Sequence, residues 1–148
     1  MEVKVQVGAT GTTYLDAVEI RKKVFIEEQG IDPVDEFDEN ENLFTYYVGY
    51  ENNQPVVTAR SRKIADDNDT WVVQRVATIE NQRRRQLGQQ LFSAIEKRAQ
   101  QKQISKIRLH AQESAEPFYF VLGYQRVSGP EMEAGIKHYW MEKNIEKE

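Results

Sequence analysis

Three consecutive arginines, Arg83–Arg85, stand shortly before Gly88 and at the start of a helix-like apolar pattern. A helix start carries partial positive charge and free N–H groups, so each cation there costs roughly 0.3–1 kcal/mol unless an anion lies among them. A tight loop entering a helix directs several backbone N–H groups at one place, which favours phosphate. Arginine adds bidentate, charge-assisted contacts. The pattern indicates a phosphate-binding loop, with a solvated surface run as the alternative.

Two common nucleotide-binding motifs are excluded at this loop. The phosphate loop of nucleoside triphosphatases needs a glycine, four residues, and then Gly-Lys-Ser/Thr, which the segment lacks. The dinucleotide fingerprint needs several glycines, and Gly88 is the only glycine here. The loop therefore predicts a different phosphate-bearing ligand.

The loop lies between two strongly patterned segments. Residues 70–79, TWVVQRVATI, form a near-continuous apolar run that predicts a strand buried on both faces. After the arginines, apolar residues repeat at three- and four-residue spacing and predict a helix: Leu87, Leu91, Ala94, Ile95 and Ala99. The chemistry is thus expected at a strand-to-helix crossing.

The remaining chain predicts further alternating elements. Val3, Val5 and Val7 indicate a first strand, and a helix capped by Thr12 or Thr13 should run to Gln29 before Gly30 ends it. The acidic segment 31–42 is interpreted as a solvated loop. Strands are expected at 43–50, 55–64, 104–111, 124–128 and 137–142, a hairpin turn at 51–54, a short helix at 114–122 closed by Gly123, and a loop at 129–135.

This order mixes hairpins with strand-helix-strand crossings. It predicts an α/β three-layer sandwich whose mixed, mostly antiparallel sheet has about seven strands and helices on both faces. The chain has 148 residues, of which 39% are hydrophobic and 30% charged, so we expect a single domain over 1–148.

Composition limits the partners. The net charge of −4 disfavours binding to nucleic acid or to anionic membranes, and the arginine run is a local exception. Neither a signal-peptide pattern nor a transmembrane candidate is present. Without cysteine the chain has no thiolate nucleophile and no disulfide, which agrees with the cytoplasm as the expected compartment.

The loop resembles the acetyl-coenzyme A loop of the GNAT superfamily of N-acyltransferases, whose pattern is Gln/Arg-x-x-Gly-x-Gly/Ala. Arg83 and Gly88 match its ends, whereas Gln86 stands where the first glycine usually lies. Residues 75–79, RVATI, are similar to the central strand of that superfamily, and residues 115–124, AEPFYFVLGY, to its final-helix signature.

Two further segments resemble the ElaA-like and YjcF-like branch of the superfamily: IRKKVFIEEQ at 20–29 and AGIKH at 134–138. The resemblance implies an acetyl-CoA-dependent N-acetyltransferase that acts on a primary amine by direct attack in a ternary complex. The implied cofactor-binding residues are Val76, Ala77, Thr78, Arg83, Arg84, Arg85, Gln86, Leu87, Gly88, Gln89, Gln112 and Phe118.

Acetyl transfer from a thioester to an amine needs a neutral nucleophile, a donor at the carbonyl oxygen and an acid for the departing thiolate. Tyr119 is the predicted acid, because it falls on the tyrosine of the superfamily signature. Its alternative role is core packing, since Phe118, Phe120 and Leu122 surround it in the sequence.

The residues on the acceptor side are expected to be Glu27, Glu28 and His138. The alternatives are solvated charges at a helix end, a half-buried strand histidine, and proton relay through water. The two histidines, His110 and His138, are interpreted as too few and too far apart for a metal site, so no metal is expected, although carboxylates could complete such a site.

The main alternative function is a non-catalytic module that keeps the fold and binds coenzyme A or a partner. Gln86 and the lack of an obvious base favour it. The acceptor amine stays unidentified, and a homodimer stays open because many relatives in the superfamily are dimers.

Overall fold

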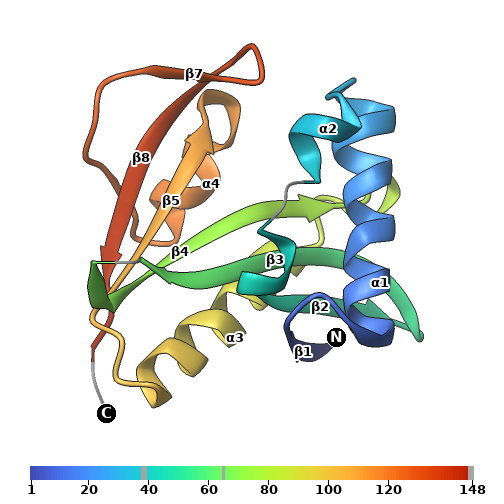
Figure 1. Cartoon of the computed structure of the whole chain (residues 1–148), viewed down its shortest axis with the longest axis horizontal. Helices are drawn as coiled ribbons and strands as arrows, with labels where there is room; N and C mark the ends of the chain where they lie inside the picture. Colours follow the sequence, from blue (N-terminus) through green and yellow to red (C-terminus); the bar gives the residue numbers. More distant parts are fainter. Residues whose placement is uncertain (38–39, 65, 147–148) are drawn as a thin grey trace. The chain divides into compact units, whose positions relative to one another are not determined.

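The computed structural model describes residues 1–37, 40–64 and 66–146. Figure 1 shows strands and helices interspersed along the chain, with β2, β3 and β4 following one another directly. In chain order the elements are β1 Glu2–Val7, α1 Gly11–Arg21, η1 Lys22–Glu28, α2 Pro33–Glu36, η2 Glu41–Leu43, β2 Thr45–Glu51, β3 Gln54–Ile64, β4 Asp67–Thr78, η3 Glu80–Gln82, α3 Leu87–Gln101, β5 Lys106–Gln112, η4 Glu113–Ala115, α4 Glu116–Val121, β6 Gln125–Arg126, β7 Glu131–Glu133 and β8 Ile136–Asn144.

The strands hydrogen-bond in the order β1-β2-β3-β4-β5-β8-β6, with β7 also on β8. β4 and β5 run parallel, from Thr70 opposite Lys106 to Val73 opposite Leu109. The pairs β1–β2, β2–β3, β5–β8, β6–β8 and β7–β8 are antiparallel. The predicted mixed, mostly antiparallel sheet is therefore confirmed, with eight strands among the described residues where about seven were expected.

The contacts divide the chain into two compact units. Unit 1 comprises Met1–Arg62 and Arg75–Ile95, and unit 2 comprises Lys63–Gln74 and Glu96–Glu148. The expectation of a single domain stays a prediction. In the described ranges no helix has both the length and the apolar character needed to cross a bilayer.

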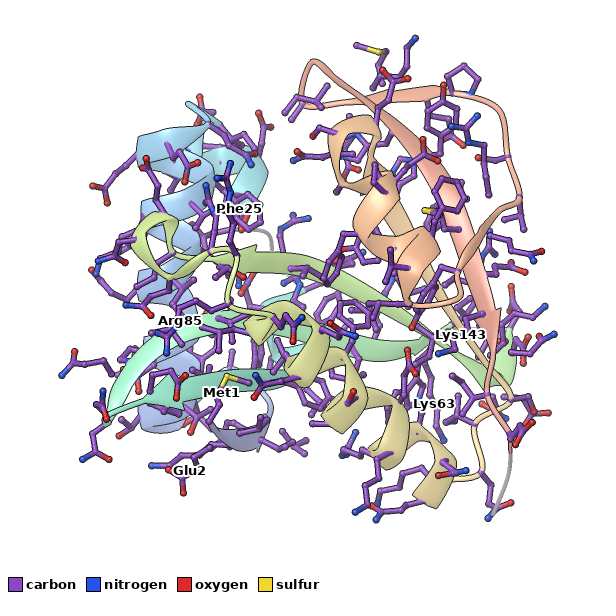
Figure 2. The ribbon with its side chains drawn as sticks, turned by 180° about the vertical axis from the view of Figure 1, so that it is seen from behind. Met1, Glu2, Phe25, Lys63, Arg85 and Lys143 are labelled. Atoms are coloured by element: carbon purple, nitrogen blue, oxygen red, sulfur yellow. The ribbon has the colours of Figure 1, made fainter. Side chains whose placement is uncertain are left out.

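Unit 1 has its core between α1 and one face of its strands. Ala17 and Ile20 of α1 pack with Tyr46 and Val48 of β2, and all four are at most 1% exposed. Figure 1 shows α1 in front of these strands, and Figure 2, from behind, shows α3 leaving the loop marked by Arg85. The predicted apolar stripe of the first helix thus faces the core.

The first helix changes its winding at Lys22. The sequence predicts one regular helix to Gln29, but residues 22–28 form a π-helix, in which the N–H of Gln29 bonds to the carbonyl of Val24 five residues earlier. Gly30 then adopts a left-handed φ of +72°, which glycine permits, and the helix ends as predicted. Val24 and Phe25 of this π-helix are both buried.

The interpretation of segment 31–42 as a solvated loop is wrong for Glu36 and Glu41 and for the helical turns that carry them, whereas residues 32–35 are exposed as expected. The Asp32 carboxylate accepts a hydrogen bond from the Val34 N–H at 2.9 Å and so caps the short helix α2. Glu36, in α2, is only 2% exposed. Its charge is tolerated because arginines surround it, as described below; Asp38 and Glu39 lie outside the described residues.

Two hairpins are closed by two-residue turns with positive φ. Asn52 and Asn53 have φ of 51° and 65° between β2 and β3, which confirms the predicted hairpin. Ala134 and Gly135 have φ of 50° and 75° between β7 and β8. The predicted loop at 129–135 therefore contains a strand, and β8 begins at Ile136.

Unit 2 is built on β5 and β8. The predicted strand at 104–111 and short helix at 114–122 are present as β5 and α4, and Gly123 closes the helix with a φ of +96°. The end of α3 is tied to this unit, since Glu96 accepts hydrogen bonds from Tyr124 at 2.9 Å and Lys143 at 2.8 Å. The strand predicted at 124–128 is short, Gln125–Arg126.

Candidate functional site

The arginine loop connects β4 to α3 as predicted. The first helical hydrogen bond runs from the Gln90 N–H to the Gln86 carbonyl at 3.1 Å. The N–H groups of Leu87, Gly88 and Gln89 therefore precede the hydrogen-bonded ladder of the helix. Donors of this kind, at the positive end of a helix dipole, suit a diphosphate.

The loop backbone uses a conformation that glycine favours. Arg84 and Gln86 both have left-handed φ values, 65° and 62°. For a residue with a side chain this conformation costs roughly 1–2 kcal/mol. Gln86, which replaces the first glycine of the superfamily pattern, thus keeps a glycine-like backbone, and its side chain is exposed.

The three arginines have different partners. Arg83 makes a bidentate ion pair with Glu28 of η1, with both N···O distances 2.6 Å, and its Nε donates to the Thr78 carbonyl at 3.0 Å. Arg85 contacts Gln82 and lies 3.3 Å from the Glu51 carboxylate. For Arg84 the described part of the chain gives no hydrogen bond or ion pair, and its side chain is exposed. Arg84 is therefore the arginine most available to an anion.

Glu28, a predicted acceptor-side residue, is held by the loop. Hydrogen bonds from Arg83 lower the pKa of the Glu28 carboxyl, and Glu28 in turn raises the pKa of Arg83. A carboxylate stabilised in this way is a weaker base. Its neighbour Glu27 is exposed and has no ion pair among the residues that the structure describes.

The predicted strand residues Val76, Ala77 and Thr78 form the end of β4 in unit 1. Ala77 is 4% exposed and packs into the core under α1. Arg75 precedes them with a left-handed φ of 56°, so the strand is irregular directly before the residues expected to bind pantetheine. The backbone of this segment continues into the arginine loop.

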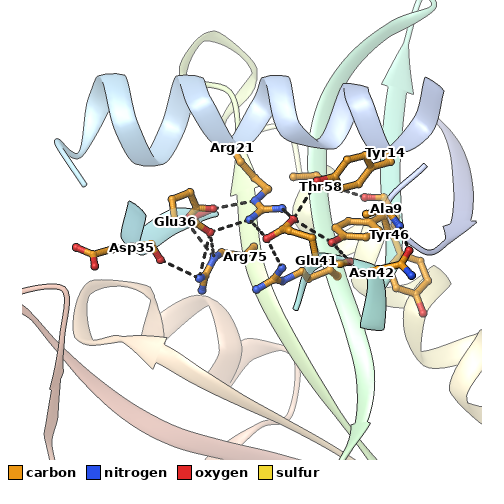
Figure 3. Close-up of polar contacts among 12 residues, drawn as sticks. Ala9, Tyr14, Arg21, Asp35, Glu36, Glu41, Asn42, Tyr46, Thr58 and Arg75 are labelled. Carbon is orange, nitrogen blue, oxygen red and sulfur yellow. Dashed lines mark hydrogen bonds and ion pairs between the residues drawn. The ribbon is translucent and has the colours of Figure 1, made fainter. Parts of the chain in front are cut away.

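A buried ionic network in unit 1 was not predicted (Figure 3). Arg21 of α1 donates from Nε to Glu36 Oε2 at 2.8 Å and from Nη1 to Glu41 Oε1 at 2.8 Å. Arg60 of β3 donates to Glu41 Oε2 at 2.8 Å, and Arg75 lies 3.1 Å from Glu36 Oε1. The network joins α1, α2 and η2 to β3 and β4.

The two carboxyls of this network respond differently to their surroundings. Burial raises the pKa of Glu36 despite its arginines, whereas Arg21 and Arg60 lower the pKa of Glu41 to about 2, against burial. In the sequence, the network was indicated only by Arg21, a cation at a core-facing position of the first helix next to Ile20. Its partners follow 15 and 20 residues later, a separation that no helical or strand period encodes.

Four predicted residues lie in unit 2: Gln112, Phe118 and Tyr119, described here, and His138, described below. Gln112 ends β5, Phe118 is half-buried on α4, and Tyr119 is 6% exposed. The rings of Phe118 and Tyr119 meet edge to face at 5.0 Å. Burial raises the pKa of Tyr119, so its phenol stays protonated at neutral pH and remains a hydrogen-bond donor.

The interpretation that the two histidines are far apart is wrong. His110 on β5 and His138 on β8 stack with ring centroids 4.9 Å apart, because the antiparallel register places Gln112 opposite His138 and His110 opposite Trp140. Within the described ranges no group of three or more His, Cys, Asp or Glu residues is placed to hold a metal ion.

The chain matches the family model of the Acetyltransferase (GNAT) domain over residues 20–145. It is 33% identical over 130 residues to the uncharacterized N-acetyltransferase YjcF of Bacillus subtilis, covering 87% of this chain and 91% of that protein. The crystal structure of Escherichia coli ElaA superposes with a TM-score of 0.83 at 26% identity, covering 96% of this chain and 98% of ElaA.

A more distant structure extends the comparison. An aminoglycoside 6′-N-acetyltransferase complexed with coenzyme A superposes with a TM-score of 0.73 and covers 100% of this chain and 99% of that one. At 13% identity this likeness concerns the fold alone. From the family match, the ElaA and YjcF likenesses and the sheet, the chain belongs to the GNAT acetyltransferase family.

Proposed function

We propose that this chain transfers the acetyl group of acetyl-CoA to the primary amine of a small molecule or protein, by direct attack in a ternary complex. Family membership supports acyl transfer. The choice of acetyl-CoA as the acyl donor is supported by the start of α3. There the N–H groups of the first turn follow the exposed Arg84 in the loop. Acetyl-CoA supplies the acetyl group as an activated thioester.

The residues of unit 1 are assigned to the diphosphate and the pantetheine arm. Arg83, Arg84, Arg85, Gln86, Leu87, Gly88 and Gln89 would hold the diphosphate through backbone N–H groups and guanidinium charge. The backbone of Val76, Ala77 and Thr78 would hydrogen-bond the pantetheine arm, since these residues lie beyond the pairing of β4 with β5, which runs from Thr70 to Val73.

The residues of unit 2 are assigned to the thioester end. The Gln112 amide would contact the pantetheine arm, and Phe118 would pack beside it. The Tyr119 phenol would donate a hydrogen bond to the sulfur as the C–S bond breaks. Its raised pKa makes full proton transfer costly, so the hydrogen bond itself is the stabilising contact.

We assign Glu27, Glu28 and His138 to the binding of the acceptor amine. Glu27 is exposed and available to a cationic amine, whereas Glu28 is engaged by Arg83. A chain without cysteine is typical of a reducing compartment, so we assign the reaction to the cytoplasm.

The Glu28→Gln variant is expected to bind acetyl-CoA about two- to fivefold more tightly than the wild type. Arg83 is bound on both nitrogens by Glu28, and a partly exposed ion pair of this kind is worth about 0.2–1 kcal/mol. Removing it releases the guanidinium for the diphosphate.

Isothermal titration with acetyl-CoA measures the change. Glu27→Gln is the matched control, since it removes the same charge one residue earlier without an ion pair to break. Equal effects of the two substitutions would show that general electrostatics, not release of Arg83, sets the affinity.

Thermal unfolding with and without acetyl-CoA tests the cofactor assignment. Ligand at 100 times its dissociation constant stabilises the folded protein by about 2.7 kcal/mol. Gly88→Trp, in the first turn of α3, should abolish this shift. Gly129→Trp is the control, because a Cβ at exposed Gly129 meets no atom within 4 Å. The assignment fails if the wild type shows no shift at millimolar ligand or if Gly88→Trp keeps it.

A further inference from the structure

We infer that His138 accepts the proton released by the neutral acceptor amine as it attacks, and that a second, cationic group of the acceptor is drawn to Glu131 and Glu133. This inference rests on the proposed acetyl transfer. As the amine nitrogen bonds to the acetyl carbon, the C–S bond breaks, the electron pair leaves with the sulfur, and the nitrogen's proton passes to His138 Nε2.

The hydrogen bonds of His138 fix it in the form that a base requires. Its Nδ1 lies 2.7 Å from the Ile136 carbonyl oxygen, which can only accept, so Nδ1 carries the hydrogen. The neutral ring therefore presents a lone pair at Nε2. The side chain is 8% exposed, which keeps this tautomer from exchanging its bond with water.

Glu133 is placed to stabilise the imidazolium that forms. Its Oε2 lies 3.7 Å from His138 Nε2 and accepts a 2.7 Å hydrogen bond from His110 Nδ1. A carboxylate at this distance favours the protonated ring by Coulomb attraction while leaving Nε2 without a direct hydrogen bond. The arrangement is a base with a charged neighbour and a second residue that orients it.

A column of planar side chains holds the two histidines in orientation. The Arg108 guanidinium lies 4.7 Å over the Trp140 ring, Trp140 stacks on His110 at 4.5 Å, and His110 stacks on His138 at 4.9 Å. The members come alternately from β5 and β8 on one face of the sheet, since opposite residues of a ladder share a face. His110 is therefore a positioning residue.

The surroundings of His138 are acidic. Glu131 and Glu133 of β7 are 53% and 47% exposed, and Glu113 of η4 is 55% exposed. Lys137 lies 3.9 Å from Glu113. This excess of carboxylates beside an exposed edge attracts amines that carry a second positive charge.

The experiment measures acetylation of putrescine and of butylamine, which differ by one ammonium group. Wild type should prefer putrescine by about two- to fivefold in kcat/KM, and Glu131→Gln should remove that preference, mainly by raising the KM for putrescine. Lys137→Gln, which leaves the carboxylates in place, should keep the preference.

His138→Gln should lower kcat by about 10²–10⁴-fold. His110→Gln should lower kcat less. Added imidazole should restore part of the rate of His138→Ala. Wild-type kcat in His138→Gln would overturn the inference.

Acetyl-CoA binding separates this inference from the proposed function. His138→Gln should bind acetyl-CoA as the wild type does, which also shows that it folds. If the wild type acetylates the amines and His138→Gln does so at the same rate, His138 is not the base, and the proposed acetyl transfer still stands. Lack of wild-type turnover on both amines refutes a cationic amine acceptor, whereas lack of acetyl-CoA binding by the wild type refutes the proposed function.

Discussion

Glu41→Gln is expected to lower the free energy of unfolding at pH 7 by about 3–5 kcal/mol. The Glu41 carboxylate accepts hydrogen bonds from Arg21 at 2.8 and 3.1 Å and from Arg60 at 2.8 Å. Both arginines are 1% exposed. The amide removes the charge that compensates two buried guanidinium groups.

Urea denaturation measures this loss, with Glu19→Gln as the control. Glu19 is an exposed residue of α1, so its substitution should change stability by less than about 0.5 kcal/mol. If Glu41→Gln unfolds at the same urea concentration as the control, the network does not stabilise the protein.

The pH dependence of Glu41→Gln supplies a second readout. The folded pKa of Glu41 is lowered from 4.5 to about 2, so the unfolded chain takes up the proton first. The stability due to Glu41 is therefore present above about pH 4.5 and is lost as the pH falls toward 2. The difference between wild type and variant should shrink over this window. Glu36, whose pKa is raised, acts in the opposite direction.

Tyr119→Phe is expected to lower kcat by about 10²–10³-fold, the usual loss when one preorganised donor is removed from a reacting centre. Phenylalanine keeps the ring that packs on Phe118 and deletes only the hydroxyl. Acetyl-CoA affinity should change little, because the donor acts on charge that develops during the reaction. Continuous detection of released coenzyme A thiol measures kcat.

Tyr124→Phe is the matched control for this variant. Tyr124 is buried in the same unit, its ring lies 6.0 Å from that of Tyr119, and its hydroxyl donates to Glu96 at 2.9 Å. Its loss should reduce stability and leave kcat within about twofold. If kcat falls by the same factor in both variants, the Tyr119 hydroxyl contributes through packing and not through a hydrogen bond to the sulfur.

The sequence predicted the loop and its flanking elements because their signals are local. The spacing of Leu87, Leu91 and Ile95 is a helical period, and glycines at 30 and 123 mark real helix ends with positive φ. The π-helix at Lys22–Glu28 was not predictable in this way, since its wider turn has no simple apolar period.

The sites that depend on register or on distant ion pairs were missed. Both β5 and β8 were predicted, but the pairing that stacks His110 on His138 is a property of their register. Likewise, the acidic segment looked solvated because Glu36 and Glu41 find their arginines on other elements. The pairing of Arg83 with Glu28 joins residues 55 positions apart.

Product analysis tests the central claim most directly. The wild type is incubated with acetyl-CoA and a panel of primary amines. The products are identified by mass spectrometry, and the release of coenzyme A thiol is measured in parallel. We predict an amine product heavier by one acetyl group, formed in equal amount to the free thiol and absent in Tyr119→Phe at matched times. Saturable acetyl-CoA binding without any acetylated product would contradict catalysis and favour a non-catalytic coenzyme A-binding module.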